Sequence, residues 1–272
     1  MVKAGVGINQ NLSDHKKAAS DAGVEALGKL GGSQPNIVFA FSSIQYNQED
    51  VLAGLKSVFP SALIVGGSAA GEITSWVTNF DSVNVMAVAS DQISFATGIG
   101  ANVQADSSKA GAMAVEDLIK NKGGQKPNLL ILIVDGMAAN GSAVVEGARS
   151  VLGADAPMIG GSAGDDYLFK KTYEYYNDKV VTDTVVAVGF YGDFSYGFGI
   201  RHGWTPVGLP VKVTKANGVW IQELDGQPAL KLYEDYFGKE ASELVKEPLA
   251  RMAYTYPIGI AVEGSDELLI RD

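Results

Sequence analysis

An internal duplication constrains the fold of this chain more than any other feature of its sequence. Two stretches carry the same features in the same order, 92 to 94 positions apart. The matched pairs are a Gly-x-Gly at 5–7 and 98–100, a stretch ending in Gly-Gly-x-x-Pro-Asn at 15–36 and 107–128, an aliphatic run at 37–43 and 129–136, and Gly-Gly-Ser-Ala at 66–69 and 160–163. One match could arise by chance, but four in one order indicate a tandem duplication.

Each copy alternates predicted strands with predicted helices. A short strand with the Gly-x-Gly precedes a helix, and a buried aliphatic strand follows. A second helix is expected at about 49–59 in the first copy and 142–152 in the second, and a short strand then leads into Gly-Gly-Ser-Ala, which we interpret as a loop. An antiparallel hairpin, turning at 90–91 or 192–193, closes the unit. The expected caps of the first helix are Ser13 in one copy and Ser107 or Ser108 in the other.

A third segment follows the two copies. It predicts a hairpin turning at Asn217-Gly218, a helix opened by Asp225-Gly226 with Pro228 in its first turn, and two terminal strands. The predicted fold class is therefore α/β, with two tandem pseudo-repeated α/β units that have mixed sheets, followed by a smaller α+β C-terminal segment. The expected boundaries are 1–96, 97–202 and 203–272.

Charge and composition exclude several classes of function. The net charge is −10 and the pI about 4.7, which disfavours binding to nucleic acid or to an anionic membrane. The chain has no cysteine, and its aliphatic run at 129–134 is too short to cross a bilayer. The N-terminus lacks the apolar segment of a signal peptide, so a cytoplasmic location without a membrane span is expected.

Several stretches of the sequence resemble the FIST sensory domain. They are VGGSAAGEI, IGGSAGD, the VDG that ends at position 136, and above all HGWTPVG, VTKANG and ELDGQPALKLYEDYFG. The first two units are similar to the FIST N-terminal region, and residues 203–272 to a shortened FIST C-terminal region. The resemblance implies a ligand-sensing module of signal transduction, with amino acids as proposed ligands. Because the chain carries no kinase or other output domain, a separate output protein is expected as its partner.

The repeated Gly-Gly-Ser segments are the predicted binding site. Successive bare amides in such a turn favour an anion, and nearby carboxylates suit an ammonium group, so a zwitterion such as an amino acid is expected between the repeats. Glycines needed only for close packing are the alternative. Asp135 follows a buried strand and could equally be a capping residue. The predicted ligand-binding residues are Gly66, Gly67, Ser68, Gly71, Glu72, Asp135, Gly160, Gly161, Ser162, Gly164, Asp165, Asp166, His202 and Trp204.

Two alternatives from other classes of protein stay open. Some proteins that resemble this family bind haem and sense nitric oxide, and His202 beside Trp204 is the candidate axial ligand. A serine hydrolase would use Ser162 in a Gly-x-Ser-x-Gly elbow, with Asp165 or Asp183 and His202. The elbow requires a helix directly after the serine, where the sequence predicts loop and strand. No catalytic residue is therefore assigned, and no histidine pair has the spacing of a metal site.

Overall fold

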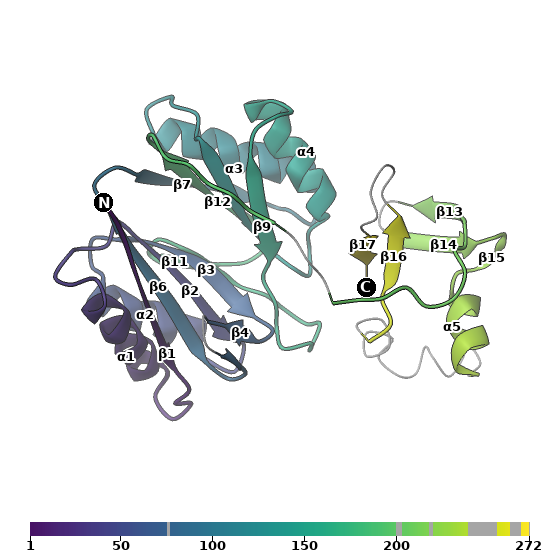
Figure 1. The fold of residues 1–272 in the computed structure, drawn as a ribbon, viewed down its shortest axis with the longest axis horizontal. Coiled ribbons are helices and arrows are strands. Elements are labelled where there is room, and N and C mark those ends of the chain that lie inside the picture. Colours follow the sequence, from purple (N-terminus) through teal and green to yellow (C-terminus); the bar gives the residue numbers. More distant parts are fainter. Residues whose placement is uncertain (75–76, 200–202, 218–219, 239–254, 262–267, 272) are drawn as a thin grey trace. The chain divides into compact units, whose positions relative to one another are not determined.

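The structure is a computed structural model that describes residues 1–74, 77–199, 203–217, 220–238, 255–261 and 268–271. Its contacts divide the chain into two compact units, Met1–Tyr196 and Gly197–Asp272. The first unit holds both copies of the duplication, and the second holds the C-terminal segment (Figure 1).

The two copies fold with the same strand order. The first sheet contains β1-β6-β2-β3 and the second β7-β12-β8-β9, so each strand has its counterpart at the same place. In these two sets of four strands, the pairs β2–β3 and β8–β9 are parallel and the other pairs are antiparallel. The first copy consists of β1 (Val2–Asn9), α1 (His15–Gly28), β2 (Ile37–Ser43), α2 (Gln48–Val58), β3 (Leu63–Ala69), β4 (Glu72–Ile73), β5 (Thr78–Asn79) and β6 (Val83–Ser90). The second consists of β7 (Ser94–Ala101), α3 (Ser107–Asn121), β8 (Leu129–Val134), α4 (Gly141–Leu152), β9 (Met158–Ser162), β10 (Glu174–Tyr176), β11 (Lys179–Val181) and β12 (Thr184–Tyr191). These mixed sheets confirm the α/β class.

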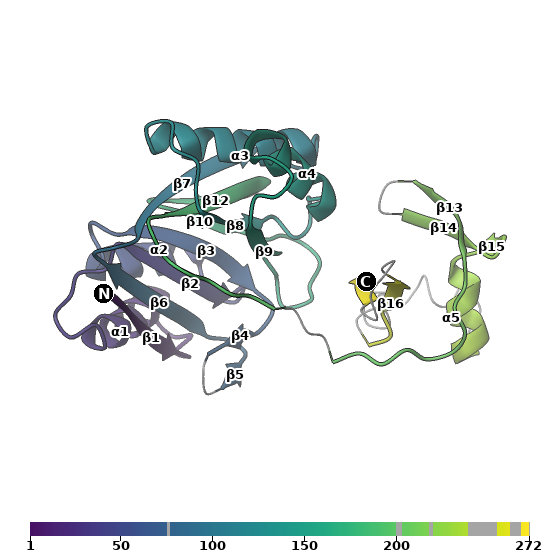
Figure 2. The same ribbon diagram turned by 45° about the horizontal axis from the view of Figure 1, so that its top comes forward.

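The first unit has four layers, helices outside and two sheets face to face inside (Figures 1 and 2). Alternate residues of β2 show why. Val38 and Ala40 pack under α1 and α2, whereas Ile37 and Phe39 join a core shared with β8 and β12 of the other sheet. Both faces of each central strand are therefore apolar, as the aliphatic runs require. Burying one such side chain contributes about 1.5–3 kcal/mol.

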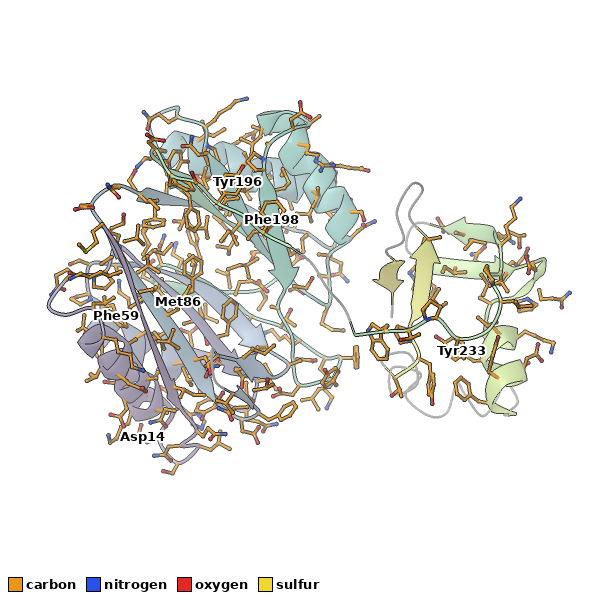
Figure 3. The ribbon with its side chains drawn as sticks, viewed as in Figure 1. Asp14, Phe59, Met86, Tyr196, Phe198 and Tyr233 are labelled. Atoms are coloured by element: carbon orange, nitrogen blue, oxygen red, sulfur yellow. The ribbon has the colours of Figure 1, made fainter. Side chains whose placement is uncertain are left out.

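The helix layers pack closely against their sheets because small residues line the contacts. A Cβ on Gly7 of β1 would lie 2.0 Å from the Ala22 carbonyl oxygen of α1, and one on Gly100 of β7 would lie 1.9 Å from that of Ala110. Only glycine fits there, which explains the repeated Gly-x-Gly. In the first helix layer, Phe59 at the end of α2 contacts Gly23 of α1 (Figure 3).

Two predictions about local structure were wrong. The caps of α1 and α3 are Asp14 and Asp106, whose carboxylates accept from the amides of Lys17 and Lys109. The backbone at these aspartates is extended, as a cap requires, and their charge favours the positive helix end. The predicted hairpin that turns at 90–91 does not form, because β6 pairs with β1 and β2 whereas β7 pairs with β12. After its counterpart turn at 192–193, residues 194–199 form no strand.

One hairpin crosses from the second copy to the first sheet. β10 pairs antiparallel with β3, so β10 and β11 extend the first sheet to six strands. The equivalent hairpin of the first copy, β4–β5, forms a two-stranded sheet of its own. If a twofold axis related the two copies, the β4–β5 hairpin would likewise join the second sheet. Among the described strands it does not.

The second unit contains two small antiparallel sheets and one helix. Its elements are β13 (Val213–Asn217), β14 (Trp220–Leu224), β15 (Gln227–Pro228), α5 (Leu230–Phe237), β16 (Ile258–Ala261) and β17 (Leu268–Arg271). The predicted hairpin is confirmed as β13–β14, although 218–219 lie outside the described residues. Pro228 is not in the first turn of the helix. Asp225 and Gly226 both have positive φ and fold β15 back onto β14, so the helix begins later.

Candidate ligand-binding site

The first Gly-Gly-Ser-Ala is the end of β3 and not a loop, which corrects the prediction. Gly66 has a φ of +138°, and a Cβ there would lie 1.7 Å from the Ala40 carbonyl oxygen. A Cβ on Gly67 would lie 2.4 Å from the Tyr173 oxygen. Ser68 is buried, and its amide and hydroxyl both bond the main chain of Tyr173, at 2.8 and 3.0 Å. These groups are already engaged, so the packing alternative accounts for this segment.

The second Gly-Gly-Ser-Ala is the end of β9 and has a different environment. Gly160 packs against Leu132 of β8, where a Cβ would lie 2.3 Å from the carbonyl oxygen. Gly161 has open space around its Cα, and both glycines and Ser162 are exposed. The two copies therefore share a sequence but not a degree of burial.

The structure brings the ends of the two segments into contact. The Gly164 amide donates a hydrogen bond of 2.9 Å to the Ser68 carbonyl oxygen. A Cβ on Gly164 would lie 2.8 Å from the Ala70 amide nitrogen, so the contact needs glycine. Next along the first segment, Gly71 has a φ of +96° and lies against the Phe80 ring.

Asp135 and Asp165 are fully used as structural caps. Asp135 accepts hydrogen bonds from the amides of Met137 and Ala138, the hydroxyl of Thr172 and the amide of Asp183. Asp165 accepts from the amides of residues 169, 170 and 171. Both carboxylates are buried. The capping interpretation of Asp135 is therefore supported by its contacts, and Asp165 has the same role in the loop after β9.

Glu72 and Asp166 differ from these caps, because each keeps one carboxylate oxygen without a partner among the described residues. Glu72 is 2% exposed, and its Oε2 accepts from the hydroxyl and the amide of Ser82 at 2.7 and 3.3 Å. Asp166 Oδ2 accepts from the Ser43 hydroxyl at 2.6 Å. Glu72 Oε1 and Asp166 Oδ1 are buried and have no hydrogen-bond partner among the described residues. Buried acceptors without a donor are energetically costly.

Hydrogen bonds link Glu72 to Asp166 through Ser82 and Ser43, since the Ser43 amide donates to the Ser82 oxygen at 3.0 Å. Burial raises the pKa of the Glu72 carboxyl, the hydrogen bonds from Ser82 lower it, and the charges of Asp166 and Asp81 raise it further. Asp166 belongs to the second copy, whereas Glu72, Ser82 and Ser43 belong to the first. The acids therefore meet where the two copies join.

Sequence reasoning missed a second buried acid, Glu174. It is completely buried at the start of β10, its Oε2 accepts from the Thr184 hydroxyl at 2.8 Å, and its Oε1 has no partner among the described residues. Burial raises its pKa to about 8, with the charges of Asp135 and Asp183 acting in the same direction. A sequence signal exists: in both copies a hairpin glutamate lies ten positions before the hydroxyl residue that it binds.

The sequence comparison assigns the family. The profile of the FIST N domain matches residues 36–227, which is more than half of the chain. The chain belongs to the FIST family. The resemblance seen in the Gly-Gly-Ser segments is thereby confirmed.

This FIST protein has uncharacterized relatives. An uncharacterized protein of Methanocaldococcus jannaschii is 37% identical over 93 residues, which cover 34% of this chain and 17% of that protein. Uncharacterized proteins from two Mycobacterium tuberculosis strains, CDC 1551 and H37Rv, are each 27% identical over 283 residues, covering 99% of this chain and 69% of theirs.

Two solved structures of cyanuric acid hydrolase are distantly similar. The enzyme from A. caulinodans has a TM-score of 0.36 at 8% identity, covering 69% of this chain and 70% of its own. A second has a TM-score of 0.37 at 11% identity, covering 71% and 68%. Scores this low carry no functional argument for the FIST chain.

The remaining predicted site residues of the FIST chain lie elsewhere or outside the described part. His202 is outside the described residues, and Trp204 is an exposed residue of the second unit. Residues 163–173, which follow Ser162, contain no helix, so they lack the geometry of a nucleophile elbow.

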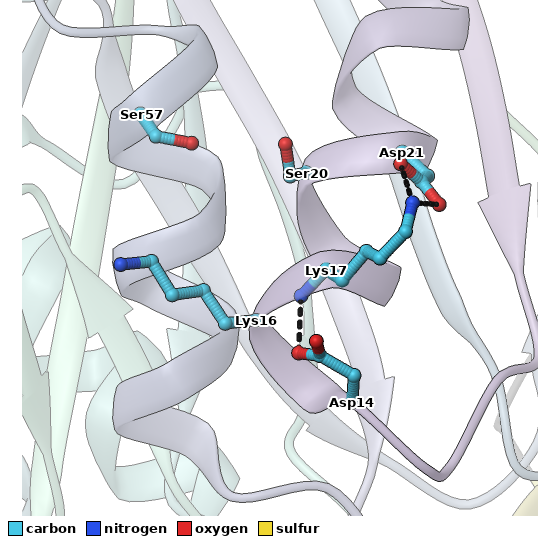
Figure 4. Close-up of a pocket in the computed structure, with 6 residues that line it drawn as sticks. All are labelled: Asp14, Lys16, Lys17, Ser20, Asp21 and Ser57. Carbon is cyan, nitrogen blue, oxygen red and sulfur yellow. Dashed lines mark hydrogen bonds and ion pairs between the residues drawn. The ribbon is translucent and has the colours of Figure 1, made fainter.

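A shallow depression on the helix layer is separate from these acids. Its volume is 330 Å³ (Figure 4). Lys17 pairs there with Asp21 at 2.7 Å, and both side chains are exposed. None of the predicted site residues lines it; the lining residues are Asp14, Lys16, Lys17, Ser20, Asp21 and Ser57.

The described part of the FIST chain shows neither a metal centre nor a membrane-spanning helix. No group of three or more His, Cys, Asp or Glu side chains there is arranged to hold a metal ion. None of the helices described is long and apolar enough to cross a membrane.

Proposed function

We propose that this FIST chain is a small-ligand-binding sensory module of signal transduction, and that its ligand carries a primary ammonium group, as an amino acid or a related metabolite does. The ammonium would bind between the copies, at Glu72 and Asp166. The observation that carries the proposal is the pair of buried carboxylate oxygens, Glu72 Oε1 and Asp166 Oδ1, that lack a donor among the described residues.

An ammonium group matches this arrangement chemically. It offers three donors and no acceptor, whereas the two orphaned atoms are acceptors. A buried polar atom without a partner costs about 1–3 kcal/mol, and a charged donor would recover that cost and add a charge-assisted hydrogen bond. The raised pKa of Glu72 means that its carboxyl group binds a proton more readily than an exposed glutamate does. A cation and a proton would therefore compete for the same carboxyl group.

The two acids come from different copies of the duplication, which supports a sensory role. Glu72 precedes the last strand of the first copy, and Asp166 lies in the loop after β9 of the second. A ligand held by both would stabilise one relative position of the two copies over others. Such a differential affinity is what a ligand needs in order to shift a conformational equilibrium, which a separate output protein could then read.

A thermal-shift screen with all the amino acids and simple primary amines tests this function. We expect a concentration-dependent rise of the unfolding midpoint with at least one of them. The rise should disappear in Glu72→Gln and in Asp166→Asn, and should persist in Asp21→Asn, which alters an exposed acid of α1. If no amine shifts the wild-type protein, or if the shift survives both variants, the proposed function is wrong.

A further inference from the structure

A buried amide donor lies beside the acids of the proposed site. Asn84 of β6 is 7% exposed, and its Nδ2 has no hydrogen-bond partner among the described residues. The Ser82 hydroxyl lies between Asn84 and Glu72, at 3.3 Å from Asn84 Oδ1 and 2.7 Å from Glu72 Oε2. One serine therefore holds the ends of these two side chains next to each other. The neighbourhood has an unused donor as well as unused acceptors, and each of them is costly to bury.

The face of the first sheet that carries Asn84 also carries exposed apolar side chains. Asn84 pairs with Phe41 of β2, so both side chains lie on the same face of the sheet. Earlier on this face of β2, Ile37 and Phe39 join the core between the sheets and are 0% and 7% exposed. Phe41 is 39% exposed and is the one exposed residue of its strand. Met86, two residues after Asn84 on the same face, is 38% exposed. Open space therefore adjoins the buried amide.

The charges that act at this place are negative. The carboxylates of Asp166 and Asp81 both raise the pKa of Glu72, and the whole chain has a net charge of −10. A ligand carboxylate would be repelled by these acids, and a single neutral amide donor such as Asn84 would not offset that repulsion. The group that binds Asn84 Nδ2 is therefore expected to be a neutral acceptor, such as a carbonyl oxygen.

We propose that the ligand carries an α-aminoacyl group, in which a single carbon separates the ammonium from a neutral carbonyl, as at the N-terminus of a short peptide or in an amino acid amide. This inference rests on the proposed function, because the ammonium binds Glu72 and Asp166 as described above. The carbonyl oxygen accepts from Asn84 Nδ2, and an apolar side chain of the aminoacyl group lies against Phe41.

An aminoacyl group uses the unpartnered atoms of this site together. Its ammonium supplies donors to the carboxylates, and its carbonyl supplies the acceptor that Asn84 lacks. A free amino acid fits less well, since it places a negative charge where the carbonyl is neutral. A simple amine leaves the Asn84 donor buried without a partner. Capture of a peptide N-terminus by a few fixed polar groups is a recurring mode of recognition.

Titration calorimetry of the full chain with related ligands tests this inference. Phenylalanine amide has the ammonium, the neutral carbonyl and an apolar ring, whereas phenylalanine has a carboxylate instead and phenethylamine has neither. We expect the amide to bind roughly tenfold more tightly than phenethylamine, the effect of one hydrogen bond, and also more tightly than phenylalanine. N-acetylphenylalanine amide, which lacks the ammonium, should not bind. If the natural ligand is a peptide, Phe-Gly-Gly should bind at least as tightly as the amide, and a small natural amide is indicated if it binds less tightly.

Substitutions locate the two new contacts. Asn84→Leu removes the amide donor at nearly constant volume and should abolish the preference for phenylalanine amide over phenethylamine. Phe41→Ala should weaken the binding of phenylalanine amide more than that of glycine amide. Met113→Ala, at a similarly exposed apolar residue of α3, is the matched control and should change neither. Circular dichroism and the unfolding midpoint check that each variant is folded.

The wild-type protein alone distinguishes a failure of this inference from a failure of the proposed function. If phenethylamine binds as tightly as phenylalanine amide, or if free phenylalanine binds more tightly than the amide, the ammonium site stands and the aminoacyl inference is wrong. A preference for the amide that Asn84→Leu leaves intact overturns the inference as well. If no primary amine binds at all, the proposed function and this inference are both wrong.

Discussion

Glu72 and Glu174 are equivalent residues of the two copies, each opening a hairpin and each bound through Oε2 to a hydroxyl ten positions later. The acceptor distances are 2.7 Å to Ser82 and 2.8 Å to Thr184. Both carboxyl groups are buried, both keep Oε1 without a partner among the described residues, and burial raises the pKa of both. The duplication has therefore preserved a buried acid that the Gly-Gly-Ser similarity alone does not point to.

The first prediction concerns Glu174 and pH. Its pKa rises from 4.5 to about 8 on folding, so between these values the folded state holds a proton that the unfolded state has lost. Stability should then fall as pH rises through this window, by about 1.4 kcal/mol per pH unit at most. Glu174→Gln keeps the shape of the protonated acid and should remove this loss. Urea unfolding of both proteins at pH 5 to 8 measures it.

The free energy of unfolding of Glu174→Gln should exceed that of the wild type most near pH 8, and the difference should shrink toward pH 4.5. If the two proteins keep a constant difference across the window, Glu174 does not take up a proton on folding.

The second prediction compares equivalent glycines. A Cβ on Gly67 would lie 2.4 Å from a main-chain oxygen, whereas Gly161 has open space. Gly67→Ala should reduce the free energy of unfolding by about 1–3 kcal/mol, because the strand pair cannot move apart cheaply. Gly161→Ala should change it by less than about 0.5 kcal/mol. Denaturant unfolding of both variants decides this, and equal effects would contradict the difference in burial between β3 and β9.

The third prediction concerns Asp135. Its carboxylate accepts hydrogen bonds from three amides and from the buried Thr172 hydroxyl, and Asp135→Ala leaves all four donors without this acceptor. We expect a loss of about 2–4 kcal/mol, since each orphaned donor costs about 1 kcal/mol or more. Thr172→Val removes fewer of these bonds and should cost less. A near-neutral Asp135→Ala in thermal and urea unfolding would show that the turn is held by other contacts.

The fourth prediction links the proposed ligand to protons. Because the pKa of Glu72 is raised in the folded protein, an ammonium that binds its carboxylate should displace a proton. The apparent affinity should therefore fall as pH decreases toward and below that raised pKa. Titration calorimetry in two buffers of different ionisation enthalpy measures the protons released. Asp21→Asn is the control. Binding with no proton exchange at any pH from the usual glutamate value of 4.5 upward would place the ammonium elsewhere.

The sequence predicted much of the fold because its signals are local. Aliphatic runs at 37–43 and 129–136 and the repeated Gly-x-Gly follow from strand burial and helix packing inside one copy. The predicted helix caps were wrong, because the caps are the neighbouring Asp14 and Asp106. Serine and aspartate are both good caps, and only the backbone geometry distinguishes between them.

The candidate site was predicted less well, because its chemistry depends on contacts between copies. Glu72 and Asp166 were expected at the site, but so were Asp135 and Asp165, which are saturated by main-chain amides. All four read alike in the sequence as acids near strand ends. Ser43 was missed because nothing local marks a side chain whose partner lies in the other copy. Glu174 was missed because its signal, a glutamate ten positions before a hydroxyl residue, is visible only when the two copies are compared.

The sequence by itself determined that the chain folds as two similar α/β units, since a duplicated pattern of burial forces a duplicated arrangement of strands and helices. Only the tertiary structure decided how the units combine: sheet against sheet, with β10 moved onto β3 and β9 left at an edge. The reason is that pairing between distant strands is set by shape and by main-chain hydrogen bonds, which identical segments such as Gly-Gly-Ser-Ala cannot specify on their own.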